Sequence, residues 1–112
     1  MGSTARGDVA QGSLIPVVFT EDARADVLDA FDFYEEREQG LGERFRDHLD
    51  FAIAKVKASP ERYPIVHRNL RRKLVERFPY AVFYRFDPGV IVVVAVMHGR
   101  QAPALWKGRA PQ

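Results

Sequence analysis

The feature that most constrains the fold is an apolar run from Val90 to Met97, which follows the turn signal Asp87-Pro88-Gly89. Six of its eight residues are Val or Ile. Such β-branched residues favour strands, and a strand that is apolar on both faces needs cover on both. The segment before the turn, Tyr80 to Phe86, is also rich in aromatic and β-branched residues. We therefore predict a hairpin whose second arm is a central strand.

Two further segments are expected to join this sheet. The basic stretch from Arg71 to Phe78 leads into the hairpin and is expected to form a strand beside it. The short triplet Val17-Val18-Phe19 lies just before Thr20, a residue type that favours the start of a helix. It is predicted to be a first strand.

The region between these strands has helical periodicity. Thr20 is followed by apolar residues at helical spacing, and Gly40 is suited to the left-handed turn after a helix. A second amphipathic segment runs to Ser59-Pro60, where proline should stop it. The predicted fold class is therefore α+β, with an N-terminal strand and an antiparallel helical hairpin packed on a three- or four-stranded, mainly antiparallel sheet. The two apolar stripes are Ala23, Val27, Ala30, Phe31 and Tyr34, and then Phe45, Leu49, Ala52, Ile53 and Val56.

The length of 112 residues fits one domain. Residues 1–16 are predicted to be a flexible leader or a remnant of the expression vector, residues 17–109 the domain, and residues 110–112 a tail. The absence of cysteine excludes disulfides and thiolate metal sites. The longest apolar run is far short of the roughly 20 residues that a membrane helix needs, and no signal peptide pattern is present. We expect a cytoplasmic protein with no membrane partner.

Charge is divided unevenly along the chain. Residues 20–59 hold eleven Asp and Glu against six Lys and Arg, whereas residues 60–112 hold three against ten. The acidic residues of the first helix are expected to form a solvated outer face, since they fall opposite its apolar stripe. An acidic half and a basic half indicate surfaces with different neighbours.

Sequence motifs for metal or cofactor chemistry are weak. The three histidines, His48, His67 and His98, are far apart, and none lies four residues from another. There is no glycine-rich phosphate loop and no serine nucleophile elbow. No metal and no cofactor are expected.

The basic residues of the sheet are the first candidates for a site. Guanidinium groups stabilise phosphate charge, and His or Tyr can transfer protons, so an RNA-cleaving site is one interpretation. The other is that strand alternation separates these residues and that the aromatic rings serve the core. The candidates are Arg71, Arg72, Lys73, Arg77, Arg85 and Arg100, with Tyr80, Tyr84 and His98.

The C-terminal half of the chain has a recognisable order of short segments. It begins with Arg71-Arg72-Lys73-Leu74, Arg77-Phe78-Pro79-Tyr80 and Phe83-Tyr84-Arg85. An apolar strand follows, which ends in His98-Gly99-Arg100 before Pro103 and Trp106. This order resembles the RelE/ParE superfamily, and within it the ParE-like branch. The resemblance implies the toxin of a type II toxin-antitoxin system, with growth inhibition and plasmid stabilisation as its effects. It also implies neutralisation by a cognate antitoxin of ribbon-helix-helix type, in a higher-order complex.

The resemblance leaves three functions open. A ParE-like toxin inhibits DNA gyrase by binding, without chemistry of its own, and this is the function that we expect. A ribosome-dependent mRNA endonuclease of the RelE type would use Arg71, Lys73, Arg85, His98 and Arg100. A non-toxic antitoxin-binding module is the third, because Gln101-Ala102 departs from the common Arg-Asp of the branch. The expected binding residues are Arg71, Arg72, Lys73, Arg77, Tyr80, Tyr84, Arg85, His98, Arg100 and Trp106.

Overall fold

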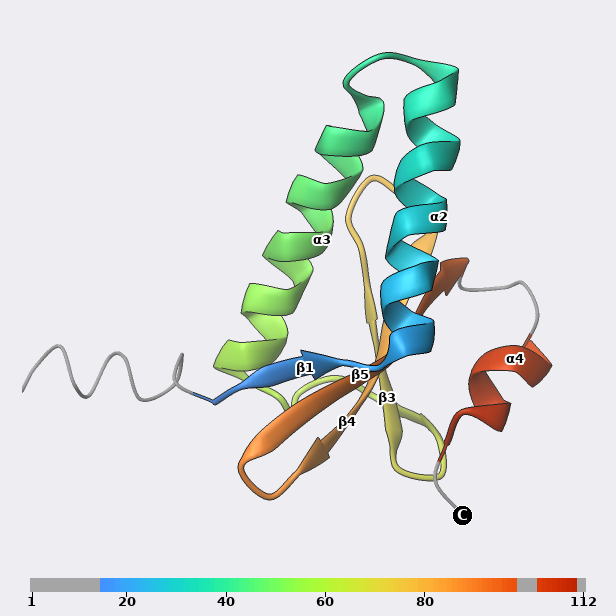
Figure 1. The fold of residues 1–112 in the computed structure, drawn as a ribbon. Coiled ribbons are helices and arrows are strands. Elements are labelled where there is room, and N and C mark those ends of the chain that lie inside the picture. The colour runs from blue at the N-terminus through green and yellow to red at the C-terminus, as the bar shows by residue number, and fades with distance from the viewer. Residues whose placement is uncertain (1–14, 99–102, 111–112) are drawn as a thin grey trace, which may run out of the picture.

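The computed structural model describes residues 15–98 and 103–110. Strand β1 (Val17–Phe19) leads into the helices α2 (Glu21–Arg37) and α3 (Leu41–Ala58), which form an antiparallel hairpin. Four strands follow, β2 (Ile65–His67), β3 (Leu70–Leu74), β4 (Tyr80–Asp87) and β5 (Val90–His98), and then the short helix α4 (Pro103–Gly108). The hairpin rises from one side of the sheet, and α4 lies beside the sheet at the C-terminal end (Figure 1). The predicted α+β class is confirmed.

Local chemistry sets the ends of the helices. The Thr20 side chain accepts a hydrogen bond from the Ala23 amide at 3.1 Å and so caps α2, as the sequence predicts. Gly40 adopts a left-handed φ of 89°, a conformation that costs glycine little. The Glu35 carboxylate accepts from the amides of Gly40 and Gly42, each at 3.0 Å. Glu35 therefore holds the turn between the helices, and the prediction that it belongs to a solvated outer face is wrong.

Gly42 lets α2 and α3 approach closely. A Cβ at this position would lie 2.8 Å from the carbonyl oxygen of Phe31, which is backbone and cannot swing away. We expect Gly42→Ala to lower the free energy of unfolding by about 1–3 kcal/mol, measured by urea unfolding. Gly108→Ala is the matched control, since its Cβ would meet nothing within 4 Å. Equal urea midpoints for the two variants would contradict this role of Gly42.

The sheet has five strands in the order β1-β5-β4-β3-β2. This corrects the predicted count of three or four, because β1 pairs in parallel with β5 and the short β2 adds an edge beside β3. The other pairings are antiparallel, so the sheet is mixed. The predicted basic strand ends at Leu74, and the residues after it form the loop to β4. Residues before Val17 already contact the sheet: Ile15 packs on the core, and the Pro16 carbonyl accepts a hydrogen bond from the Ile91 amide.

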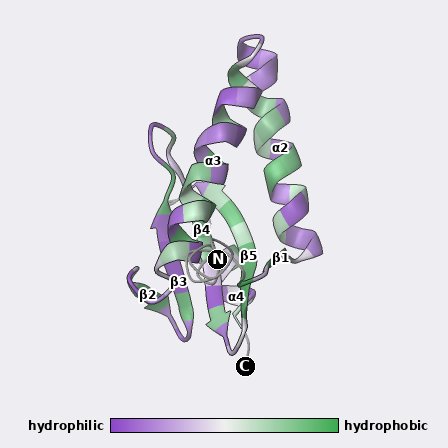
Figure 2. Cartoon of the chain, turned by 90° about the vertical axis from the view of Figure 1, so that its left-hand side faces the viewer, coloured by the Kyte–Doolittle hydropathy of each residue, from purple (hydrophilic) through white to green (hydrophobic). Residues whose placement is uncertain are grey.

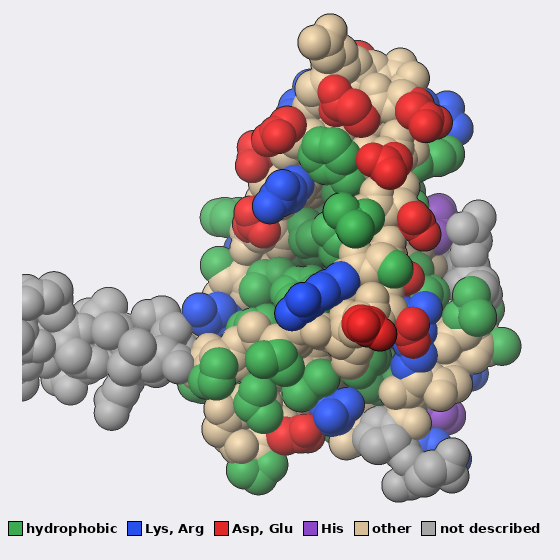
Figure 3. Space-filling model, in the orientation of Figure 1, with side chains coloured by type: hydrophobic (Ala, Val, Ile, Leu, Met, Phe, Trp, Pro, Cys, Tyr) green, Lys and Arg blue, Asp and Glu red, His purple; other side chains and the backbone are tan. Residues whose placement is uncertain are grey.

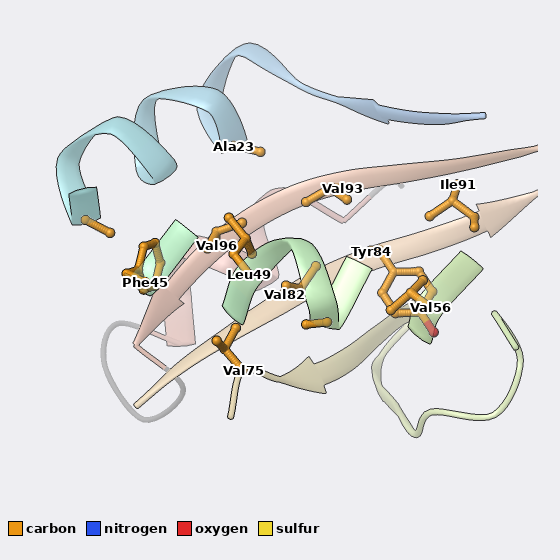
Figure 4. Packing of buried hydrophobic residues seen from close by; sticks show 12 residues of the cluster. Ala23, Phe45, Leu49, Val56, Val75, Val82, Tyr84, Ile91, Val93 and Val96 are labelled. Carbon is orange, nitrogen blue, oxygen red and sulfur yellow. The ribbon is translucent and has the colours of Figure 1, made fainter. Parts of the chain in front are cut away.

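The central strand β5 has a hydrophobic core on each of its faces. Figure 2 shows β5 as a hydrophobic strand, with the two helices over one side of the sheet. On that side Tyr84 of β4 lies beside Val56 of α3 (Figure 4). On the other side Phe83 and Val92 pack with Trp106 of α4. The prediction of a central strand covered on both faces is confirmed.

A bulge reverses the alternation of β5 halfway along. Phe83 pairs with Ala95 and Tyr84 pairs with Val93, so Val94 is an extra residue on β5. Val93 and Val96 consequently both face the helices, whereas Val94 and Ala95 both face α4. The sheet therefore presents two surfaces whose side chains do not follow simple alternation.

Candidate functional site

The predicted basic residues are divided between the two faces of the sheet. Residues directly opposite on paired strands share a face. Arg71 lies opposite Tyr84 on the helix side, and Lys73 lies opposite Val82 on that side. Arg72 lies opposite Phe83, on the face that α4 covers. Arg85 pairs with Val92 and shares this second face.

Most of these residues already hold parts of the fold together. The Arg71 guanidinium donates to the carbonyls of Glu61 and Tyr63, at 3.0 and 2.7 Å. Lys73 donates to the carbonyl of Leu74, and its ammonium lies 5.3 Å from the Tyr63 ring centroid. The Arg71 hydrogen bonds and the Lys73–Tyr63 contact fasten the loop between α3 and β2.

The far face carries a different set of contacts. Arg85 forms an ion pair with Asp87 at 2.8 Å. Trp106 stacks on Phe83 with ring centroids 4.3 Å apart, and its indole N–H has no partner among the described residues. Trp106 is thus a core residue of this face.

Tyr84 is buried, and its hydroxyl donates to the Pro60 carbonyl at 2.6 Å. Burial raises the pKa of Tyr84 to about 12, although the nearby Arg71 guanidinium acts in the opposite direction. The hydroxyl therefore stays protonated at neutral pH, and its proton is used in the hydrogen bond to the loop residue Pro60.

A pH dependence follows from this tyrosine. Above pH 10 an unfolded chain loses the phenolic proton, whereas the folded chain keeps it until about pH 12, so stability falls as pH rises through this window. The expected loss is about 1.4 kcal/mol per pH unit. Tyr84→Phe should show a shallower decline, because the Tyr84 contribution is gone while Tyr80, whose pKa is also raised by burial, keeps its own. At pH 7 the variant should be less stable by about 1–3 kcal/mol because the Pro60 carbonyl loses its donor. Urea unfolding between pH 7 and 12 measures both effects. An equally steep decline in the variant would contradict the assignment.

A second group of predicted residues gathers at the far end of the helical hairpin. Tyr80 lies opposite His98, and their rings are 6.1 Å apart. The Tyr80 ring also contacts Tyr34 and Phe45. Burial raises the pKa of Tyr80, and the carboxylates of α2 raise it further, so its hydroxyl stays neutral at physiological pH. Arg77 lies in the adjoining loop with a left-handed φ of 69°.

This end of the molecule contains a cleft of about 620 Å³, which we call the distal cleft. Its aromatic wall is formed by Tyr34 and Phe78, whose rings are 5.0 Å apart. Sequence reasoning missed most of its residues, although Arg44 and His48 are spaced four apart and so share one face of α3. The lining residues are Tyr34, Leu41, Arg44, His48, Arg77, Phe78 and Pro79.

The candidate nuclease residues are not brought together around one groove. His98 pairs with Tyr80, and Arg71 pairs with Tyr84, four residues further along β4. At a rise of about 3.4 Å per residue, roughly 13 Å of strand separates them. Arg85 lies on the opposite face, and Arg100 lies outside the described residues. Their catalytic role stays a prediction.

A second hollow lies along the helical hairpin and is called here the hairpin groove. It has a volume of about 590 Å³. Hydrophobic side chains gather along the seam between α2 and α3 and over β1, with basic side chains among them (Figure 3). Leu28 is 64% exposed there. The groove is lined by Phe19, Val27, Leu28, Phe31 and Leu49, with Arg24, Asp32, Arg46 and Asp50 as its charged residues.

One ion pair that the sequence did not indicate closes the open edge of β5. The Asp26 carboxylate accepts from Arg109 at 2.7 Å and from the Val96 amide at 3.0 Å. Arg109 also donates to the Val94 carbonyl at 2.9 Å. These side chains satisfy backbone groups of β5 beyond the end of β1, where no described strand pairs with it. Asp26 is therefore not part of a solvated acidic face, contrary to the sequence prediction.

Within residues 15–98 and 103–110, no three His, Asp or Glu side chains converge in a way that could hold a metal ion. In the same part of the chain, no helix is long and apolar enough to cross a bilayer. The hairpin groove and the distal cleft are both of ligand size, the first largely apolar and the second basic and aromatic.

Comparisons with known proteins agree with this architecture. Residues 17–103 match the family model described as the ParE toxin of type II toxin-antitoxin system, parDE. Among solved structures, the chain is similar in fold to the chromosomal ParDE toxin-antitoxin system from P. aeruginosa, with a TM-score of 0.68 and 15% sequence identity. That similarity covers 76% of this chain and 96% of the other. No curated protein sequence matches the chain.

Proposed function

This chain belongs to the ParE toxin family of type II toxin-antitoxin systems, and on that premise we propose that it arrests growth by binding DNA gyrase in the cytoplasm. The match to the family model over residues 17–103 is the observation that carries the proposal. Plasmid stabilisation is the effect that we propose for such growth arrest.

The geometry favours binding over RNA cleavage. A nuclease needs cationic groups and a proton carrier around one phosphate. Here Arg71 donates to two loop carbonyls, Arg85 is paired with Asp87, and the two lie on opposite faces. Trapping an enzyme on DNA requires a surface complementary to that enzyme, and it does not require cationic groups and a proton carrier around one phosphate.

The hairpin groove is the surface that we assign to the cognate antitoxin. A groove with apolar walls and charges at its margins suits the apolar face of an amphipathic segment. Leu28 and Phe19 supply apolar area, and Arg24, Asp32 and Arg46 supply charge of both signs. We expect the C-terminal segment of a ribbon-helix-helix antitoxin to lie there, within a higher-order complex.

Inducible expression of the full chain tests this function. Growth arrest is expected without the antitoxin, with relief on co-expression. The purified chain should inhibit gyrase supercoiling at about micromolar concentration, as a specific complex would. Unchanged supercoiling would refute the gyrase assignment, and new 5′ ends on translated mRNA would favour the nuclease. If expression causes no growth arrest, the non-toxic antitoxin-binding module becomes the favoured function.

A variant pair tests the antitoxin surface separately. Leu28→Lys should weaken antitoxin binding about tenfold or more, because it places a charge among apolar groups. Phe33→Lys is the control, since Phe33 is 44% exposed on the same helix and does not line the groove. Equal antitoxin affinity for the two variants would remove the groove from the interface.

A further inference from the structure

The distal cleft combines fixed aromatic walls with cationic side chains. Phe78 packs against Phe45 with ring centroids 5.3 Å apart, and Tyr34 stacks on the same ring at 5.4 Å. Phe45 is fully buried, so the walls are anchored in the core. The cleft is therefore formed before any ligand arrives, which lowers the entropy lost on binding.

Three nitrogen-bearing side chains line the cleft, and none of its lining residues is acidic. Arg77 is exposed, and its guanidinium has no hydrogen bond or ion pair within the described part of the chain. Arg44 pairs with Glu38 at 3.0 Å, but both side chains are more than half exposed, so this pair is weak. His48 approaches Phe78 with its ring centroid at 5.5 Å. Two guanidinium groups are thus available to an incoming anion.

The backbone of Arg77 gives a second, independent indication. A non-glycine residue with φ near 69° is strained by about 1 kcal/mol. Such conformations are often found at functional positions, where the role of the side chain outweighs the cost of the backbone strain. The loop is closed by a hydrogen bond from the Val75 amide to the Tyr80 carbonyl at 2.9 Å. Glycine would relieve the strain, but it would not place a guanidinium in the cleft.

The surroundings of the cleft decide which anion fits. Exposed carboxylates occupy the neighbouring positions of both helices, namely Glu36, Glu38, Glu43 and Asp47. Figure 3 shows Asp and Glu side chains around the far end of the hairpin. A long polyanion such as nucleic acid would be repelled by them, whereas a single carboxylate would reach the arginines. The apolar lining of Leu41, Phe78 and Pro79 requires a large apolar group beside that carboxylate.

We propose that the distal cleft binds a protein segment that carries an Asp or Glu carboxylate next to a large apolar side chain. The carboxylate is held by Arg77 and Arg44, and the apolar group lies against Phe78 and Tyr34. The hairpin groove is lined by a separate set of residues, so this site is additional to the antitoxin surface. It does not depend on whether gyrase is the target.

The test is an NMR titration of the ¹⁵N-labelled full chain with the peptide acetyl-Glu-Trp-Glu-Leu-amide. Saturable shifts are expected at the amides of Arg44, His48, Arg77 and Phe78. The matched peptide acetyl-Gln-Trp-Gln-Leu-amide should bind at least about tenfold more weakly, because it lacks the charge that guanidinium groups recognise. Oligo(dT) should bind more weakly than the acidic peptide.

Two glycine variants provide the control. Arg77→Gly should reduce peptide affinity about tenfold while the urea midpoint of unfolding stays at or above that of the unchanged chain. Arg68→Gly relieves a similar left-handed conformation, φ 53°, in the β2–β3 turn, and should leave peptide affinity unchanged. Equal affinity for the two peptides, no shifts at the cleft, or tighter binding of oligo(dT) would each overturn the proposal.

Discussion

Phe45→Ala is expected to lower the free energy of unfolding by about 3–5 kcal/mol, the range for removing a fully buried aromatic ring. Phe45 is 0% exposed and lies where the helical hairpin meets the sheet. Its ring contacts those of Tyr34, Phe78 and Tyr80, all within 5.5 Å. The truncation removes these contacts and leaves a cavity that the surrounding rings cannot fill without moving.

The matched control is Phe51→Ala on the same helix. Phe51 is 56% exposed, and its described ring contact is with the Lys55 ammonium, 4.9 Å from the ring centroid. It should change stability by about 0.5 kcal/mol or less, as surface substitutions do. Urea unfolding at pH 7 separates the two variants. If Phe45→Ala unfolds at the same urea concentration as Phe51→Ala, the aromatic cluster does not anchor the hairpin.

The sequence predicts those parts of the fold that depend on local patterns. Thr20 marks a helix start by its side-chain chemistry, and the apolar stripes of α2 and α3 repeat at helical spacing. The β4–β5 hairpin is marked by its turn residues. Each of these signals lies within a few residues of the element it defines.

Long-range pairing and irregularity leave no such signal. Three residues of β1 pair with β5 across the whole helical hairpin, which no short window reveals. The bulge at Val94 lies in a run of valines, where every residue is apolar and a change of face leaves no trace. Composition likewise hides which carboxylates of α2 turn inward.

The candidate site was predicted less completely than the fold, for a related reason. Arg71 and Arg85 are basic residues on adjacent strands, but their faces are set by register, and their partners are a loop and Asp87. The distal cleft unites Arg44 with Arg77, which come from different elements. The proximity of these two arginines depends on how the β3–β4 loop packs on the helical hairpin. No local sequence pattern predicts that contact.

Asp26→Ala is expected to lower the free energy of unfolding by about 2–4 kcal/mol, less than the range for breaking a fully buried ion pair because these side chains keep some contact with water. The Asp26 and Arg109 side chains are 14% and 21% exposed. Removing the carboxylate leaves the Arg109 charge without its short partner and the Val96 amide without its acceptor. Asp29→Ala, at an exposed position of the same helix, is the control and should change stability by about 0.5 kcal/mol or less.

A double-mutant cycle separates the ion pair from the backbone contact. If the Asp26–Arg109 attraction dominates, Arg109→Ala in the Asp26→Ala background should cost at least about 1 kcal/mol less than in the unchanged chain. If the main role of Asp26 is to accept from the Val96 amide, the two substitutions should add. Amide hydrogen exchange at Val96 tests the backbone contact itself, since loss of its acceptor should speed exchange there whether or not Arg109 is present. Unchanged exchange at Val96 in Asp26→Ala would show that this edge of β5 is protected by packing and not by the carboxylate.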